Sequence, residues 1–217
     1  MPRRYLKLEE QRLTKLVTEW LEYEATRVEF EVAETEVTRT VHLAGLTLDL
    51  RLDRVDRLQD GSLLVIDYKS GYVSLNAWEL PRPEEVQLPL YAGFALNRER
   101  ERLGGLVFAS MLPGKFKFAG QISDVVTNLF AGLKKTSTLV KNKLTEVQLR
   151  SWRDCIEQLA KDFLAGKAEV DPLDPRKACK WCDLHSLCRI QERYAQLEDE
   201  DDSEGDDRLD YAEADDE

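Results

Sequence analysis

The stretch "LLVIDYKSG", residues 63–71, decides the fold and raises the functional question. Four apolar residues in a row are typical of a strand that is buried on both faces of a sheet. Side chains two residues apart on a strand point to the same face, so Asp67 and Lys69 project together from the end of this strand. A carboxylate that is removed from water must be paired or bound to a cation. The pattern therefore indicates either a plain Asp–Lys ion pair or part of a charged site.

The preceding segment, "LTLDLRLDRVDRL" (residues 46–58), contributes a second carboxylate. Apolar and polar residues alternate up to Leu52 and the alternation breaks at Arg54–Val55, which predicts a bulge or a strand end near Asp53. The turn "QDG" (59–61) folds this strand back beside Asp67. Two converging carboxylates repel each other unless a divalent cation neutralises them, and such oxygen ligands suit Mg²⁺ or Mn²⁺. Two acids, a lysine and a divalent cation are the groups that phosphodiester hydrolysis requires.

Periodicity in the rest of the chain predicts a mixed α/β fold in which helices flank a central sheet. The predicted helices cover residues 5–25, about 85–98 with Pro89 in the first turn, and 145–166 with a capping Thr145. Further strands are predicted at residues 28–32, 37–43 and 104–112. Residues 121–144 carry little pattern, and a helical or loop excursion is expected there. Helix 145–166 should bury a stripe of Leu149, Trp152, Ile156, Leu159 and Phe163.

Almost all of the net charge of −11 resides in one segment. Residues 198–217 contain thirteen Asp or Glu and one Arg, a net charge of −12, which leaves +1 for residues 1–197. We therefore expect a folded domain over residues 1–197, followed by a disordered acidic tail that is either solubilising or regulatory and nucleic-acid-mimicking. The chain has neither a run of about eighteen apolar residues nor a secretory signal, so we expect a cytoplasmic protein without a membrane span.

Three motifs, in order, resemble the RecB-like branch of the PD-(D/E)XK nucleases, near the nuclease domain of AddB-type DNA repair helicase–nucleases. They are "LDRVD" with Asp53, "VIDYKSG" with Asp67 and Lys69, and "QLPLY" with Gln87 and Tyr91. Only Ser70 departs from these motifs, where the family has threonine, and it keeps the hydroxyl. The resemblance covers roughly residues 20–190. It implies a restriction-endonuclease-like core, a mixed sheet flanked by helices with a C-terminal knot of cysteines.

The resemblance also implies roles for individual residues. Asp53 and Asp67 would bind Mg²⁺ or Mn²⁺ with the carbonyl of Tyr68, and Lys69 would act on the attacking water. Glu36, in "FEVAETE", aligns best with a further metal-binding glutamate of the family; otherwise it is an exposed strand acid. Gln87 and Tyr91 are four residues apart and share one helical face, where they would hold the lysine or the DNA backbone. The alternative for this pair is the face of an ordinary surface helix.

Four cysteines are present, and three of them, Cys179, Cys182 and Cys188, follow the pattern C-x₂-C-x₅-C. Thiolates this close in a reducing compartment are ligands for soft metals. In the resembled nucleases such a trio and one upstream cysteine hold a [4Fe–4S] cluster. The upstream cysteine has no counterpart here, so we expect the chain to correspond to the C-terminal piece of a longer protein. Cys155 is expected to serve the core, and His185 is a substitute ligand if the metal is zinc.

The leading hypothesis is a metal-dependent DNA nuclease, exo- or endonucleolytic, that acts in repair or recombination beside a helicase-like region or subunit. The alternative is a catalytically incomplete nuclease fold that binds DNA or acts as a scaffold, and a third interpretation is a zinc-stabilised structural domain. Six lysines are candidates for a DNA track, namely Lys115, Lys117, Lys134, Lys135, Lys141 and Lys143.

Overall fold

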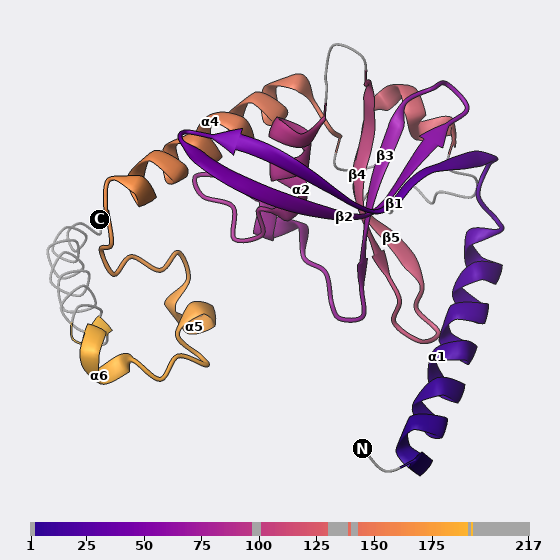
Figure 1. The fold of residues 1–217 in the computed structure, drawn as a ribbon, viewed down its shortest axis with the longest axis horizontal. Helices are drawn as coiled ribbons and strands as arrows, with labels where there is room; N and C mark the ends of the chain where they lie inside the picture. The colour runs from indigo at the N-terminus through magenta and orange to yellow at the C-terminus, as the bar shows by residue number, and fades with distance from the viewer. Residues whose placement is uncertain (1–2, 97–100, 130–138, 140–142, 191, 193–217) are drawn as a thin grey trace, which may run out of the picture. The chain divides into compact units, whose positions relative to one another are not determined.

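The computed structural model describes residues 3–96, 101–129, 139, 143–190 and 192. The chain divides into two compact units, residues 1–166 and residues 167–217. The first unit holds one mixed sheet of five strands with helices on both faces, the restriction-endonuclease-like α/β arrangement that the sequence predicts (Figure 1). No helix in the described parts of the chain is both long and apolar enough to cross a bilayer.

The strands lie in sequence order across the sheet. They are β1 (Phe30–Leu43), β2 (Leu46–Leu58), β3 (Leu63–Lys69), β4 (Leu103–Ser110) and β5 (Lys117–Ile122). Only β3 and β4 run parallel, and every other neighbouring pair is antiparallel. The parallel pair requires a crossover, and the short helices η1 (Leu75–Trp78), α2 (Gln87–Leu90) and η2 (Tyr91–Ala95) lie in it.

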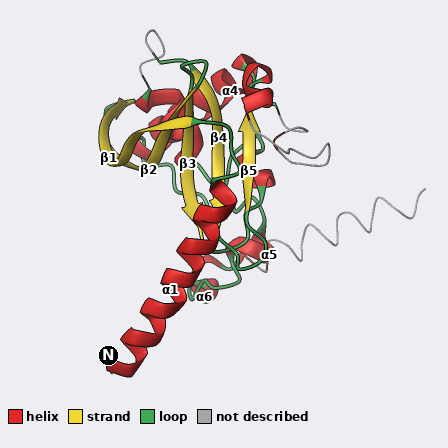
Figure 2. Cartoon of the chain, turned by 90° about the vertical axis from the view of Figure 1, so that its right-hand side faces the viewer, coloured by secondary structure: helices red, strands yellow, loops and turns green. Residues whose placement is uncertain are grey.

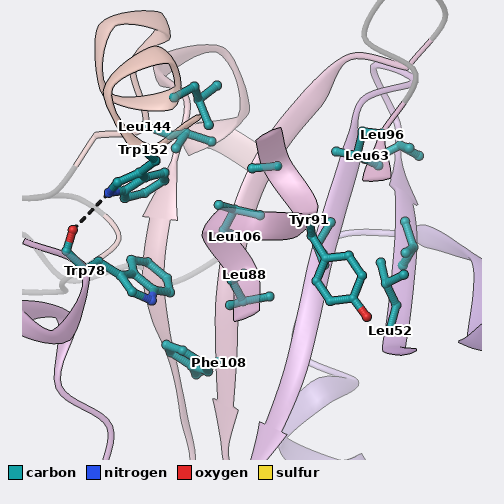
Figure 3. Packing of buried hydrophobic residues seen from close by; sticks show 14 residues of the cluster. Leu52, Leu63, Trp78, Leu88, Tyr91, Leu96, Leu106, Phe108, Leu144 and Trp152 are labelled. Carbon is teal, nitrogen blue, oxygen red and sulfur yellow. Dashed lines mark hydrogen bonds between the residues drawn. The ribbon is translucent and has the colours of Figure 1, made fainter. Parts of the chain in front are cut away.

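One face of the sheet is covered by the crossover and by α4 (Glu146–Leu164). Thr145 caps α4, because its side chain accepts a hydrogen bond from the backbone N–H of Gln148 at 3.2 Å. Trp78 and Trp152 pack edge to face, and the Trp152 indole donates to the carbonyl of Trp78 at 2.9 Å (Figure 3). The predicted stripe of α4 is buried at its first three positions, but Phe163 is 72% exposed, so its predicted burial is wrong.

The opposite face is covered by the end of α1 (Arg3–Glu24), by η3 (Asp124–Leu129) and by Leu139. Trp20 packs there among Tyr23, Tyr68 and two phenylalanines. The rest of α1 reaches past the sheet, with its N-terminus at the far end (Figures 1 and 2). As a result Leu13, Val17 and Leu21, which the periodicity places on one face, are exposed.

A buried network of charges fixes α1 to the sheet. Arg54 on β2 donates to Asp56 Oδ1 at 2.6 Å, to Glu24 Oε2 at 3.0 Å and to the Tyr68 hydroxyl at 3.0 Å. Arg27 donates to Asp56 Oδ2 at 2.7 Å and to Glu24 Oε1 at 3.0 Å. Two carboxylates therefore face two guanidinium groups, and each charge is compensated inside the protein.

The strand β5 was not predicted, because the residues after the predicted strand 104–112 carry little pattern. After the turn "PGK" (residues 113–115) the chain pairs with β4 along the whole length of β5. Gly120 is required there, since a Cβ atom would lie 2.1 Å from the carbonyl oxygen of Leu106. A glycine in the middle of a short strand interrupts the apolar pattern by which strands are recognised. The acidic tail, residues 198–217, lies outside the described residues.

The charge network predicts that Asp56→Asn destabilises the first unit strongly. The substitution leaves two buried guanidinium groups with one carboxylate, and breaking a buried pair costs about 3–5 kcal/mol. The control is Glu31→Gln, whose partner Arg57 lies 3.9 Å away with both side chains exposed, so about 1 kcal/mol or less is expected. Urea unfolding of both variants measures the difference. Equal small losses would contradict a structural role for the network.

Candidate active site

The strand β3 divides its side chains between the two faces of the sheet. Leu63 and Val65 pack in the cluster under α2 and α4, whereas Leu64 and Ile66 pack in the cluster on the α1 side. Because alternate residues share a face, Asp67 and Lys69 continue the row of Leu63 and Val65. The two charged side chains therefore emerge beneath the crossover helices, as the spacing predicts.

The register of β2 against β3 sets Asp53 opposite Asp67. Arg54 pairs with Ile66 and Val55 with Val65 in antiparallel register, so a continuation of this register by one position brings residue 53 opposite residue 67. Directly opposite residues in an antiparallel pair point to the same face. Asp53 Oδ2 accepts a hydrogen bond from the backbone N–H of Tyr68 at 2.9 Å, which fixes the carboxylate at this position. The strand β2 runs through Asp53 without ending, so of the two predicted causes of the broken alternation a strand end is wrong.

The Asp67 carboxylate is almost fully buried, and its side chain is 5% exposed. The ammonium of Lys69 forms an ion pair with Asp67 Oδ2 at 2.8 Å. This ion pair compensates part of the charge of the buried oxygen, which has no partner of hydrogen-bond geometry among the described residues. A cation or a bound water would compensate the rest.

The electrostatics of the pair favour a cation. Burial raises the pKa of the Asp67 carboxyl; Lys69 opposes the rise, and the charges of Asp53 and Glu85 add to it. Partial burial lowers the pKa of Lys69. The negative charges of Asp67, Glu85 and Asp53 raise it by more, so the pKa of Lys69 is raised overall. At neutral pH Lys69 is therefore an ammonium, a donor of hydrogen bonds and not an acceptor of protons.

The helices α2 and η2 place both predicted crossover residues at this site. Gln87 begins α2, and its Oε1 lies 3.5 Å from Lys69 Nζ. Tyr91 is buried in the core cluster beside Leu52, with its hydroxyl pointing away from Leu63 and Leu96 (Figure 3). This hydroxyl also has no partner among the described residues. Burial, and then the charges of Asp53 and Asp67, raise its pKa, so Tyr91 remains a neutral phenol.

Glu36 and Tyr68 are placed differently. Glu36 has a backbone φ of 51° on β1 and an exposed side chain, and its Oε2 accepts a hydrogen bond from Arg51 Nε at 2.7 Å. The side chain of Tyr68 lies on the α1 face with Arg54, as expected for a residue that would offer only its carbonyl to a metal. Glu85 is a further acid near the site, and it was not predicted from the sequence. The one signal in the sequence that could have pointed to it is its position two residues before Gln87.

The second unit contains α5 (Pro175–Ala178) and α6 (His185–Cys188). Cys179, Cys182 and Cys188 are free thiols there, and the Leu184 N–H donates to Cys182 Sγ at 3.4 Å. His185 Nε2 lies 2.7 Å from the carbonyl oxygen of Cys179 and not against a thiol. Across the described ranges no three or more His, Cys, Asp or Glu side chains are gathered so as to hold a metal ion. The three cysteines as they stand therefore do not form a ligand set for a cluster.

The remaining sequence candidates lie apart from these groups. Cys155 is half-buried on α4, where its thiol donates to the carbonyl of Pro81 at 3.1 Å. His42 is an exposed residue of β1, as expected for an ordinary strand position. Lys143 pairs with Asp124 at 3.1 Å, and Lys115 and Lys117 are exposed. Lys134, Lys135 and Lys141 lie outside the described residues.

Comparison with known proteins identifies the superfamily of the chain. The family model of the PD-(D/E)XK nuclease superfamily matches residues 2–189, so the chain belongs to this superfamily. Among solved structures, the crystal structure of SSO0001 is 18% identical, with a TM-score of 0.36. That match covers 71% of this chain and 59% of the other. No curated protein matches significantly.

The buried, unsatisfied carboxylate predicts that Asp67→Asn stabilises the metal-free protein at neutral pH. The folded-state pKa of Asp67 lies above the ordinary aspartate value of about 3.9, so between the two values the folded state binds more protons. Its contribution to stability is therefore lost as the pH rises through this window, and the asparagine variant escapes the loss. Urea unfolding at several pH values should give the variant a higher free energy of unfolding than wild type at pH 7. The difference should disappear at low pH.

The same variant should lose its response to Mg²⁺. A cation present at about a hundred times its Kd adds about 2.7 kcal/mol to the wild type and nothing to a protein that lacks its ligand. A variant that is less stable than wild type at pH 7 without metal, or equally stabilised by Mg²⁺, would contradict the assignment.

Proposed function

We propose that this chain is a divalent-metal-dependent nuclease domain of the RecB-like branch, which hydrolyses phosphodiester bonds of DNA in repair or recombination. The observation that carries the proposal is the meeting of Asp53, Asp67 and Lys69 on one face of the sheet, beneath the helices that bear Gln87 and Tyr91. Membership of the superfamily supports the nuclease chemistry. The order of the three motifs supports the RecB-like branch, and with it a helicase-like partner.

The donor set fits Mg²⁺ or Mn²⁺, because two carboxylates meet and Asp67 Oδ2 lacks a hydrogen-bond partner. Asp53, Asp67 and the carbonyl of Tyr68 would hold the ion. Glu36 would join them only after leaving Arg51, and an exposed pair of this kind contributes about 1 kcal/mol or less. When bound, the ion would acidify a water molecule and neutralise charge on the phosphate.

The residues of the chain supply orientation and charge. The Lys69 ammonium has three donor positions. Gln87 accepts from one of them, and Asp67 Oδ2 lies 2.8 Å away as the ion-pair partner, so donors remain for the attacking water or a phosphate oxygen. The phenol of Tyr91 lies on the same helical face and would donate to the DNA backbone. Apolar residues of the core cluster pack behind these groups, so the charges act in a medium that screens them weakly.

The proposal also covers the domain bounds, the compartment and the cysteines. The nuclease domain would span residues 1–197, with a separate acidic tail over residues 198–217. The four free thiols support a reducing, cytoplasmic compartment. The resemblance also supports a [4Fe–4S] cluster on Cys179, Cys182 and Cys188, and binding of such a cluster requires the segment to rearrange. Iron, sulfide and zinc analysis of protein purified without oxygen would distinguish this cluster from structural zinc and from free thiols.

DNA cleavage in the presence and absence of Mg²⁺ tests the proposal. The wild type should cut single- or double-stranded DNA only with Mg²⁺ or Mn²⁺. Asp53→Asn, Asp67→Asn and Lys69→Met should each lower the rate by about 10²-fold or more, since each removes a charge that would hold the metal ion or face the reacting phosphate. The matched control is Asp49→Asn, an exposed acid of the same strand β2, which should cleave at the wild-type rate.

The competing function is a DNA-binding or scaffolding module without catalysis. DNA binding without any cutting by the wild type in Mg²⁺ and Mn²⁺ would favour that module. Activity that persists in Asp67→Asn would also refute the proposed site.

A further inference from the structure

Glu85 closes the loop that connects η1 to α2. Its Oε1 accepts a hydrogen bond from the backbone N–H of Gln87 at 3.0 Å, and its Oε2 accepts one from the Trp78 indole at 3.3 Å. Its own backbone N–H donates to the carbonyl of Ala77 at 3.0 Å. One carboxylate thus joins the end of one short helix to the start of the next.

The Trp78 end of this connection is a rigid anchor. Trp78 is 1% exposed, packs on Phe108 of β4 with ring centroids 5.0 Å apart, and is hydrogen-bonded through its carbonyl to Trp152 of α4. A side chain held by both a strand and a long helix has little freedom to move. Glu85 therefore ties the start of α2 to a fixed point in the core.

The Gln87 end of the connection leads to the proposed active site. Gln87 is the first residue of α2, and its Oε1 lies 3.5 Å from Lys69 Nζ. This distance is at the limit of a hydrogen bond, so a small displacement of α2 would lose the contact. Helix α2 is only four residues long and its N-cap residue, Val86, provides no side-chain hydrogen bond. Glu85 supplies the acceptor that the missing cap leaves out.

The charge of Glu85 argues that this position is costly to occupy. Besides burial, the charges of Asp53 and Glu85 contribute to the raised pKa of Asp67, so a third acid here adds repulsion near the pair. A neutral acceptor would close the loop without that repulsion. The carboxylate has the compensating property that its two oxygens accept from Gln87 and Trp78 at once.

We propose that Glu85 is a positioning residue of the nuclease site, which holds Gln87 against Lys69 through the bridge to Trp78. The inference rests on the proposed function, since the lysine matters only if it acts in cleavage. Among the described residues Glu85 makes no hydrogen bond to the lysine or to either aspartate, so its effect on the position of the site passes through Gln87 and vanishes once Gln87 is removed. Its charge also acts on Asp67 directly, and Glu85→Gln, which removes the charge but keeps an acceptor, separates the two effects.

Steady-state cleavage kinetics of single and double variants test the proposal. Glu85→Ala should lower kcat about 10- to 100-fold with little change in KM, because a misplaced group costs rate more than binding. Gln87→Ala should have a similar effect, and the double variant should be no slower than Gln87→Ala alone. Glu85→Gln, which keeps one acceptor, should recover part of the rate. Glu79→Ala, an exposed acid of the same loop, is the control and should behave as wild type.

Multiplicative losses in the double variant, or a Glu85→Ala rate equal to wild type, would overturn the proposal. A general loss of structure would instead appear as a lowered melting temperature in Glu85→Ala and in the double variant alike, with losses that Glu85→Gln does not repair, and this too would overturn it. If the wild type cuts no DNA, the proposed function fails, and crystal structures of wild type and Glu85→Ala then decide the inference. Displacement of Gln87 from Lys69 in the variant supports it, and an unchanged contact overturns it.

Discussion

The antiparallel register between β2 and β3 is the constraint on which the rest of the site depends. Continued by one position past the Arg54–Ile66 pair, it brings Asp53 opposite Asp67 near the end of a strand whose first five residues are buried. Two carboxylates in such a place oppose folding unless something positive joins them, and Lys69 provides only part of that charge. The repulsion between the carboxylates therefore lowers the free energy of unfolding, and the packing of the surrounding core offsets this loss.

The motif "LDRVD" places functional side chains on both faces of the sheet. Because successive residues of a strand point in opposite directions, Asp53 faces the proposed metal site while Arg54 and Asp56 face α1. Those two residues, with Glu24 and Arg27, form the buried charge network that holds the end of α1. A short sequence thus couples the position of the Asp53 carboxylate to the attachment of a helix on the opposite face of the sheet.

Much of the fold could be predicted because its elements carry strong local signals. Alternation in residues 46–58, the apolar run of β3 and the Thr145 cap of α4 each specify an element by themselves. The strand β5 could not be predicted, because Gly120 is dictated by a close approach to β4 that only the tertiary structure contains. The exposure of Phe163 at the end of α4 was likewise hidden, since a periodic stripe does not reveal where the neighbouring sheet stops.

The candidate site divides in the same way. Asp53, Asp67 and Lys69 were accessible to sequence reasoning, because strand spacing and one tight turn suffice to bring them together. Glu85 was not, because a loop residue acquires its role from Trp78 and Gln87, whose positions depend on the core. The pairing of Glu36 with Arg51 depends on a local backbone conformation, a positive φ, that no pattern in the sequence indicates.

The most direct test of the central claim is an anomalous diffraction measurement on crystals of the protein soaked in Mn²⁺. The account predicts a peak between the carboxylates of Asp53 and Asp67, at about 2.0–2.2 Å from the oxygens that bind the ion. A map without a peak at this position under saturating Mn²⁺, or one in which the two carboxylates point apart, would contradict it.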